Sequence, residues 1–289
     1  MTFSIVAYSP AEKAWGVAVA SKFLAAPVVV SWARAGAGAV ATQAFGNVRF
    51  GPEGLDLMAQ GTNAEETLAK LLAADEDAEE RQVGVVDAKG NVAAFTGEYC
   101  FEYAGHVLGE GFCCQGNILT GRVTLDAMAT TFRQAPGELG DRLVAALLAG
   151  DRAGGDRRGR QSAGVLVVKE NGGYAGGNDR YLDLRVDDHA DPVVRLGELL
   201  ELHHLYFGKP VAADLLPIDS TLATELQGIL SRTGHYQGAI NGEWDDPSRE
   251  AFWDFVGMEN LEERWSIDEQ PDQLDPVLLT YIRQHFGNS

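Results

Sequence analysis

The chain has 289 residues, of which 45% are hydrophobic and 22% are charged, and its formal net charge is −19. This composition predicts a globular chain long enough for one large domain or two smaller ones, and it excludes a disordered or collagen-like protein. The excess of acidic side chains argues against binding to nucleic acid or to an anionic membrane surface, because both need a basic surface.

The cysteine content and the first residues bear on where the protein works. Three cysteines, two of them adjacent at Cys113 and Cys114, do not make the disulfide framework of a small secreted protein. Residues 1–7 contain no basic segment and run into an alternating pattern, so we expect no signal peptide. No apolar run is long enough to span a bilayer. These features predict a cytoplasmic protein that does not associate with membranes.

Apolar alternation, helical periodicity and turn residues define the expected elements in chain order. Strands are expected at 2–8 and 15–20, around the turn at Ser9-Pro10, and then at 27–32 and 37–44. Helices follow at 52–60 and 64–74, with Asn63 as the N-cap of the second helix. The remaining elements are a hairpin of 82–87 and 92–96, helices at 123–134 and 138–149, strands at 162–169 and 181–186, and a helix at 192–206.

The order of these elements predicts the fold class. Strands joined by hairpins alternate with blocks of helices, which is typical of an α+β protein whose two antiparallel sheets lie between helical layers. Gly109-Glu110-Gly111 lacks the third glycine and the following helix of a dinucleotide-binding motif. Residues 209–289 carry 15 acidic and 5 basic side chains, a stronger acidic bias than the rest of the chain, so we place a domain boundary between 208 and 209.

Thr2 is the residue with the most distinctive chemistry. Removal of Met1, which is common when a small residue follows it, would leave a threonine at the N-terminus. Such a threonine carries both a nucleophilic hydroxyl and a base, because an α-amine has a pKa of about 7.7–8.0. Lys22, just after the second strand, is the best candidate for a cation near Thr2; the alternative is a position in a solvated loop.

The residues around Thr2 resemble known families. The runs 2–7 and 16–21 are similar to the first hairpin of N-terminal-nucleophile (Ntn) hydrolases, such as proteasome β-subunits. More closely, the stretch from Thr2 to about His204 resembles a bacterial and archaeal family called domain of unknown function 1028. That resemblance rests on segments 32–43, 49–51, 115–117, 154–163, 178–180 and 182–189. It implies a four-layer αββα Ntn-hydrolase-like sandwich and a hydrolase without a cofactor.

Three polar side chains are expected near the reacting amide. The chain at 42–47 leaves a strand just before a helix, where Ntn folds present a backbone N–H to the developing oxyanion. Gln43 and Asn47 would supplement that donor, and Asn117 would present its amide into the same cleft. In each case the alternative is a polar side chain that ties down a turn.

The segment 154–163 carries the charged candidates. Its double glycine allows a sharp turn or the close approach of a ligand. Asp156 would hold the terminal amine or orient an arginine, and Ser162 would assist the amine. A bidentate clamp for a substrate carboxylate would consist of Arg157, Arg158 and Arg160. The alternative is an ion-pair cluster of these arginines with Asp183, Asp187 or Asp188.

A second resemblance covers residues 226–255, which are similar to a small three-helix peptidoglycan-binding domain. The matching residues are Leu226, Gln227, Leu230, Gly234, Tyr236, Gly238, Asn241, Gly242, Trp244, Ser248, Phe252 and Phe255. The pattern implies a helix that begins at a capped Ser248 and buries two phenylalanines one turn apart. Asp246 stands where the pattern has glycine, which puts glycan recognition in doubt more than the fold. We therefore expect a small all-α domain over 209–289.

Two functional hypotheses follow. The first is an Ntn amidohydrolase with Thr2 as nucleophile and base, acting on an amide bond in a small, carboxylated substrate or peptide. The second is a non-catalytic protein that keeps the Ntn fold and binds a ligand or a muropeptide in the same cleft. No metal is expected, because His203 and His204 are neighbours on a helix and point in different directions. For the C-terminal domain the alternatives are muropeptide binding, or packing and formation of a homo-oligomer, expected to be a dimer.

Overall fold

The computed structural model describes residues 2–287, and the chain divides into two compact units. The first unit extends to residue 200 and the second begins at 201. The boundary predicted from charge lies at 208, a few residues further along. No described helix is long and apolar enough to cross a membrane.

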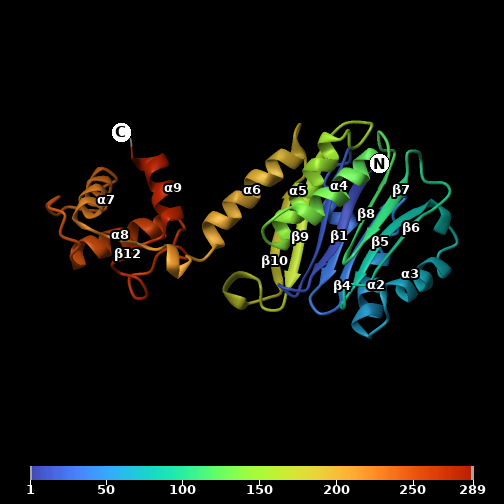
Figure 1. Ribbon diagram of the computed structural model, residues 1–289, viewed down its shortest axis with the longest axis horizontal. Helices are drawn as coiled ribbons and strands as arrows, with labels where there is room; N and C mark the ends of the chain where they lie inside the picture. The colour runs from blue at the N-terminus through green and yellow to red at the C-terminus, as the bar shows by residue number, and fades with distance from the viewer. Residues whose placement is uncertain (1, 288–289) are drawn as a thin grey trace. The chain divides into compact units, whose positions relative to one another are not determined.

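A six-stranded antiparallel sheet forms the centre of the first unit (Figure 1). Its strands, in spatial order, are β10 (Arg180–Val186), β9 (Ser162–Lys169), β2 (Ala14–Ser21), β1 (Thr2–Ser9), β8 (Phe112–Asn117) and β7 (Gly105–Gly109). β1 and β2 are almost fully buried, because the sheet is covered on both faces. This explains their small and β-branched residues, which pack closely on either side.

A four-stranded antiparallel sheet packs against the six-stranded sheet. Its order is β3 (Ser31–Arg34), β4 (Gly38–Ala44), β5 (Arg81–Asp87) and β6 (Val92–Thr96). The core between the two sheets includes Val6, Val17 and Val19 from one side and Ala39, Ala41 and Val86 from the other. Alternation along each strand sends the next residues to the opposite face, where helices cover them.

Helices cover the two outer faces (Figure 1). Helices α4 (Val123–Gln134) and α5 (Leu139–Arg152), with the first part of α6 (Pro192–Phe207), pack on the six-stranded sheet. Helices α2 (Phe50–Ala59) and α3 (Ala64–Ala73) pack on the four-stranded sheet. The layers are therefore helices, sheet, sheet and helices, in the α+β class that the sequence predicts.

Most expected elements of this unit are confirmed, one is wrong, and two strands are additional. Asn63 caps α3 as predicted, since its side chain accepts a hydrogen bond from the Glu66 N–H. The strand expected at 27–32 is wrong: the short helix α1 (Ala26–Val30) precedes β3, and Pro27 stands at its start. Proline suits the first turn of a helix because the missing N–H needs no partner there. Strands β7 and β8 are additional to the expected elements.

The second unit has its own hydrophobic core. It contains α7 (Ser220–Arg232), α8 (Asp246–Met258) and α9 (Pro276–Phe286), with the short strands β11 (Leu216–Pro217) and β12 (Gln273–Leu274) paired to each other. Trp265, Phe252 and Phe255 are at most 1% exposed and form the centre of this core. The helical character and the two buried phenylalanines agree with the expectation.

The start of α8 differs from the sequence prediction. Asp245, not Ser248, is the N-cap, and its carboxylate accepts a hydrogen bond from the Ser248 N–H. Ser248 is buried in the first turn, where its hydroxyl accepts a hydrogen bond from the Gln227 amide at 2.9 Å. Pro247 accounts for the shift, because proline favours the first helical turn and so places the cap before it.

Candidate functional site

A cavity of about 250 Å³ lies in the first unit, at the start of β1. It is lined by Thr2, Phe23, Ala26, Val29, Val30, Thr42, Gln43, Ala44, Gly46 and Val48. These residues come from the beginning of β1, from α1 and the residue Phe23 before it, and from the end of β4 with the loop that follows. Most of the lining is apolar, and the polar groups are concentrated at Thr2, Thr42 and Gln43. We call this space the Thr2 cavity.

Thr2 is held in a defined position at this cavity. The residue is only 7% exposed, and its Oγ1 lies 3.1 Å from Oγ of Ser21. Its carbonyl oxygen accepts a hydrogen bond of 3.3 Å from Nε2 of Gln43. Ser21 is a site residue that the sequence analysis missed. The β1–β2 hairpin pairs Phe3 with Ala20, so continuing that register by one residue would have placed Ser21 opposite Thr2.

Lys22 follows Ser21 at the end of β2. Its backbone N–H donates a 2.8 Å hydrogen bond to Oδ2 of Asp156, while its side chain is exposed. Among residues 2–287, no acceptor lies within hydrogen-bonding distance of its ammonium group. The buried Asp156 carboxylate also accepts a 2.8 Å hydrogen bond from the Arg158 N–H. Asp156 thus ties the chain after β2 to the loop before β9.

The three arginines predicted to clamp a carboxylate have different surroundings. Arg160 forms ion pairs with Asp151 at 2.8 Å and with Asp191 at 3.0 Å. Arg158 is 3.5 Å from the carboxylate of Asp156. The expected partners Asp183, Asp187 and Asp188 are therefore wrong for Arg160, whose carboxylate partners are Asp151 and Asp191.

Arg157 is the arginine of this cluster that is available to a ligand. Its backbone N–H donates to the Ile118 carbonyl at 3.2 Å, and its side chain is exposed. Within the described residues its guanidinium has no acidic partner. None of the three arginines lines the Thr2 cavity, but the contact with Ile118 places Arg157 one residue beyond Asn117, which pairs with Thr2 across the sheet.

Gln43 belongs to a buried network of amides between the two sheets. Its Oε1 accepts a 2.6 Å hydrogen bond from the Ser4 hydroxyl, and its Nε2 donates to Oε1 of Gln82 at 2.8 Å. Asn117 donates to the same Gln82 oxygen at 2.9 Å. Gln43 and Asn117 therefore meet at Gln82. Asn117 is the last residue of β8 and is buried, so its amide serves this network and not a turn.

Gln115 and the carbonyl of Gly116 extend this network. Gln115 donates a 2.6 Å hydrogen bond to the Ser4 hydroxyl, and Gln82 donates to the Gly116 carbonyl at 2.8 Å. Gly84 leaves the room that the Gln115 amide occupies, because a Cβ at position 84 would lie 2.3 Å from Oε1. Oε1 of Gln115 is buried without a hydrogen-bond partner among the described residues. The hydrogen bonds among Ser4, Gln43, Gln82 and Asn117 stabilise a single arrangement of the two sheets.

The loop after β4 is held by a largely buried ion pair. Asp75 and Arg81 lie 2.9 Å apart, and the side chain of Asn47 donates to Asp75 at 2.9 Å. Arg81 also donates to the Phe45 carbonyl at 2.6 Å. The Arg81 guanidinium, with the hydrogen bonds from Asn47 and from the backbone, holds the pKa of Asp75 well below its usual range. Asn47 therefore anchors the loop and does not line the Thr2 cavity.

The loop offers a backbone donor to the Thr2 cavity at Gly46. Gly46 lines the Thr2 cavity, and among residues 2–287 its N–H has no acceptor. Preorganised backbone N–H groups at such a position stabilise negative charge on a reacting oxygen.

Ser162 shapes the wall of the Thr2 cavity that contains Phe23 and Ala26. Its hydroxyl donates to the Phe23 carbonyl at 2.6 Å and accepts from the Ala26 N–H at 3.1 Å. Both partners line the Thr2 cavity, so Ser162 fixes the backbone of the wall that leads into α1. Ser21, and not Ser162, supplies the hydroxyl within hydrogen-bonding distance of Thr2.

Metal and thiol chemistry have little support among residues 2–287. No group of three or more histidine, cysteine, aspartate or glutamate side chains gathers there in a way that could hold a metal ion. Cys113 and Cys114 are fully buried in β8, and burial raises the pKa of Cys113 to about 12.

Comparison with known proteins identifies both parts of the chain. Residues 2–196 match the model of a family of unknown function, DUF1028, and residues 206–282 match a model described as "Putative peptidoglycan binding domain". A crystal structure of a DUF1028 protein from Silicibacter pomeroyi is similar, with 29% sequence identity and a TM-score of 0.65. The match covers 74% of this chain and 96% of that one. No curated protein matches the chain. The chain belongs to the DUF1028 family.

Proposed function

We propose that the first unit is an Ntn amidohydrolase in which Thr2 is the nucleophile. Removal of Met1, which lies outside the described residues, exposes the α-amine of Thr2. The amine accepts the hydroxyl proton while Oγ1 attacks the amide carbon, the C–N bond breaks, and the proton passes to the leaving amine. Water then hydrolyses the ester and regenerates Thr2. The observation that carries this proposal is the buried Thr2 hydroxyl beside Ser21 at the cavity.

The neighbouring residues have distinct roles in this mechanism. The Gly46 N–H donates to the oxyanion, because it lines the cavity and has no acceptor within the described chain. Ser21 relays or orients the proton of the Thr2 hydroxyl. Gln43 is a positioning residue, since its amide binds the Thr2 carbonyl and is otherwise bonded to the buried amide network. The succession of helices, two antiparallel sheets and helices supports the Ntn assignment.

The lining of the cavity suggests how a substrate is recognised. Phe23, Val29, Val30 and Val48 favour an apolar group on the acyl side of the amide. Lys22 and Arg157 are exposed cations at the same end of the sheet, and they would bind a carboxylate elsewhere in the substrate. Arg158 and Arg160 contribute less, because both already face carboxylates of the chain.

Covalent labelling tests the nucleophile without a known substrate. Untagged protein is treated with a small β-lactone, an electrophile that acylates hydroxyl groups, and its intact mass is measured. We expect loss of Met1 and addition of one probe, located on the peptide that begins at Thr2. The labelling rate should rise with pH and level off above about 8, where the amine is deprotonated.

Three controls make this experiment decisive. Thr2→Ser should still be labelled, whereas Thr2→Ala should not. A form with an uncleaved N-terminal extension, which lacks the Thr2 amine, should also stay unlabelled. Equal labelling of Thr2→Ala, or retention of Met1 in the untagged protein, would rule out the mechanism.

The second function is ligand binding without turnover in the same cavity. It is favoured by the hydrogen bonds that the Gln43 and Asn47 side chains already make with Gln82 and Asp75. These amides are engaged within the chain, which leaves stabilisation of an oxyanion to backbone N–H groups such as that of Gly46. Two results together would identify the protein as a binding protein of this fold. The β-lactone would fail to label it, and a ligand would bind to the native chain and to Thr2→Ala with the same affinity.

For the second unit we propose that it binds a muropeptide. Residues 206–282 match the peptidoglycan-binding model, and an open groove lies along α8. The groove contains Trp253, His235 and Met258, with Asp254 and Glu262 at its side. An exposed indole is suited to stacking against a sugar ring. Quenching or a shift of tryptophan fluorescence on adding a disaccharide-peptide, abolished by Trp253→Ala, would support this role.

A further inference from the structure

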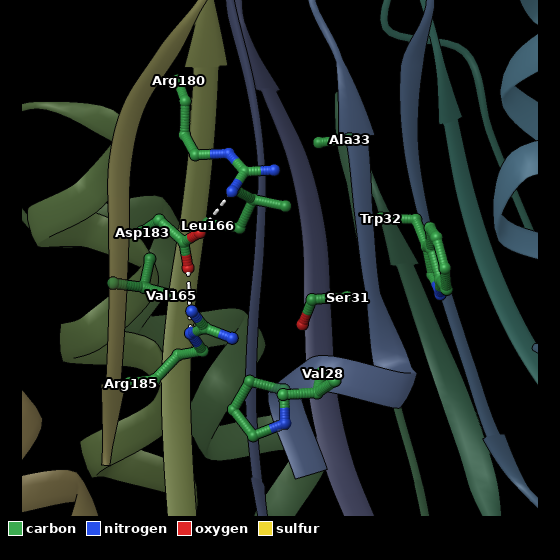
Figure 2. Close-up of a pocket in the computed structure, with 10 residues that line it drawn as sticks. Val28, Ser31, Trp32, Ala33, Val165, Leu166, Arg180, Asp183 and Arg185 are labelled. Atoms are coloured by element: carbon green, nitrogen blue, oxygen red, sulfur yellow. Dashed lines mark hydrogen bonds and ion pairs between the residues drawn. The ribbon is translucent and has the colours of Figure 1, made fainter. Parts of the chain in front are cut away.

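A second cavity, of about 200 Å³, lies at the edge where the two sheets of the first unit meet (Figure 2). It shares none of its lining residues with the Thr2 cavity. Val165 and Leu166 of β9, Arg180, Asp183 and Arg185 of β10, Ser31, Trp32 and Ala33 of β3, and Pro27 and Val28 of α1 form its walls. We call this space the arginine cavity.

Helix α1 separates the two cavities. Ala26, Val29 and Val30 line the Thr2 cavity, as expected for positions three and four apart on one face of a helix. Pro27 and Val28 lie on the other side and line the arginine cavity. The two cavities are therefore adjacent, and the short helix α1 separates them.

The charges in this cavity do not cancel. A single carboxylate, Asp183, lies 2.8 Å from Arg180 and 3.3 Å from Arg185. Two guanidinium groups and one carboxylate leave a local charge of +1, in a chain whose net charge is −19. Each guanidinium carries five N–H donors, so one shared carboxylate leaves most of them for another acceptor. Arg180 and Arg185 are 63% and 45% exposed, which allows a ligand to reach them.

An irregularity in β10 brings the two arginines together. Strand residues alternate between faces, so Asp183 and Arg185 share one face, whereas Leu182 points into the helix-covered core. Arg180 would share the face of Leu182, but the register shifts between these two residues. Such a bulge redirects side chains and is common beside functional sites. Figure 2 shows Arg180 and Arg185 on either side of Asp183.

A buried hydroxyl on the facing strand lacks a partner. Oγ of Ser31 is inaccessible to solvent and has no hydrogen-bond partner among the described residues. In Figure 2 this oxygen is directed across the cavity towards the side that carries the arginines. A buried polar group without a partner is unfavourable. A small shift of the Ser31 side chain that brings Oγ to the surface of the cavity would let an oxygen atom of a ligand satisfy it.

We propose that the arginine cavity binds a small organic monocarboxylate. The carboxylate oxygens accept hydrogen bonds from Arg180 and Arg185, in the bidentate manner that suits guanidinium. The Ser31 hydroxyl donates to the ligand once its side chain has shifted to the cavity surface. The apolar body of the ligand packs on Pro27, Val28 and Leu166. A single negative charge matches the local charge of +1, and the apolar walls disfavour inorganic phosphate.

Ligand-observed NMR titration of the full-length protein at low salt tests this site. The probes are 3-methylbutanoate and its neutral amide, which have the same shape and differ in charge. We expect the carboxylate to bind at least tenfold more tightly than the amide. Arg180→Gln and Arg185→Gln should each weaken its binding at least fivefold, and Ser31→Ala should weaken it to a smaller extent.

Matched variants show whether the carboxylate binds in this cavity and not elsewhere on the surface. Arg195→Gln removes an exposed, ion-paired arginine of α6 and should leave carboxylate binding unchanged. Thr2→Ala should also leave it unchanged, so the result does not depend on the proposed hydrolase. Equal affinity for acid and amide, tighter binding of inorganic phosphate, or binding that survives both arginine substitutions would overturn the proposal.

Discussion

At the scale of single residues, the surroundings of Thr2 depend on side chains whose partners lie far away in the sequence. Gln43 contacts Ser4 and Gln82, and Asp75 contacts Arg81 and Asn47. These residues hold the strand that begins at Thr2 and the loop beside it. Substitutions there are expected to act through stability and position, not through contact with a substrate.

Gln82 is the residue on which the amide network depends most. It is fully buried and receives hydrogen bonds from Gln43 and Asn117. Gln82→Leu would remove the acceptor of the Asn117 amide and the shortest hydrogen bond that the Gln43 amide donates, and each buried unsatisfied group costs about 1–3 kcal/mol. We therefore expect the free energy of unfolding to fall by about 3 kcal/mol in urea denaturation. Gln134→Leu, at an exposed position, should change it by less than about 0.5 kcal/mol; a similar loss in both variants would contradict this role.

Asp75 makes the stability of the loop dependent on pH. Because its pKa is lowered on folding, its contribution is fully present above the pKa of the unfolded chain, about 3.9, and is lost as the pH falls towards the lower folded value. Asp75→Asn should be less stable than the native chain by about 1–3 kcal/mol at pH 7. Urea denaturation at pH 7, 5, 4 and 3 should show this difference narrowing below about pH 4. A difference in the free energy of unfolding that stays constant from pH 7 to pH 3 would mean that the charge of the Asp75 carboxylate does not contribute to stability.

At the scale of secondary structure elements, short irregular segments decide where the cavities lie. Helix α1 replaces an expected strand and forms the wall between two cavities. The register shift in β10 turns Arg180 towards Asp183. By contrast, the long strands β1, β2 and β8 form a rigid support, since their residues are buried on both faces.

The burial of β8 predicts the reactivity of its thiols. Cys113 and Cys114 are inaccessible and their pKa values are raised by desolvation, so almost no thiolate exists at pH 8. Burial also raises the pKa of Cys100. We expect an aromatic disulfide reagent to leave Cys113 and Cys114 unmodified in the native protein and to react with all three cysteines in urea. Rapid modification of either β8 thiol under native conditions would show that the strand opens.

At the scale of the whole molecule, the chain contains two units with separate hydrophobic cores. The first core is formed by sheets and helices around β1, and the second by α7, α8 and α9 around Trp265. The two family models match the same two parts of the chain.

Separate cores predict separable effects of mutations. Phe252 is 1% exposed in the second core, and Phe252→Ala should destabilise that unit by about 3–5 kcal/mol. Hydrogen exchange during urea denaturation should show earlier opening of peptides from residues 201–287, while labelling of Thr2 is unchanged. Met258→Ala, at a position that is 73% exposed, should have little effect. Loss of Thr2 labelling in Phe252→Ala would show that the units depend on each other.

Local patterns in the sequence were sufficient for much of the secondary structure. The alternation in β1, β2 and β4, the hairpin of β5 and β6, and the N-cap at Asn63 depend on neighbouring residues, and the structure confirms them. The motifs that resemble DUF1028 and the peptidoglycan-binding domain also identified both parts of the chain. The prediction failed at α1, where Pro27 in the first helical turn outweighs the β propensity of the valines that follow.

The sequence by itself therefore determined the α+β class, the family and Thr2 as a candidate nucleophile, because these depend on periodicity and on contiguous motifs. Only the tertiary structure decided which side chains meet. It placed Ser21 beside Thr2, directed Gln43 and Asn117 to Gln82, and paired Arg160 with Asp151. It also brought Arg180, Arg185 and Ser31 around one cavity. Such contacts join distant strands, and their register follows from the packing of the two sheets, which no local pattern encodes.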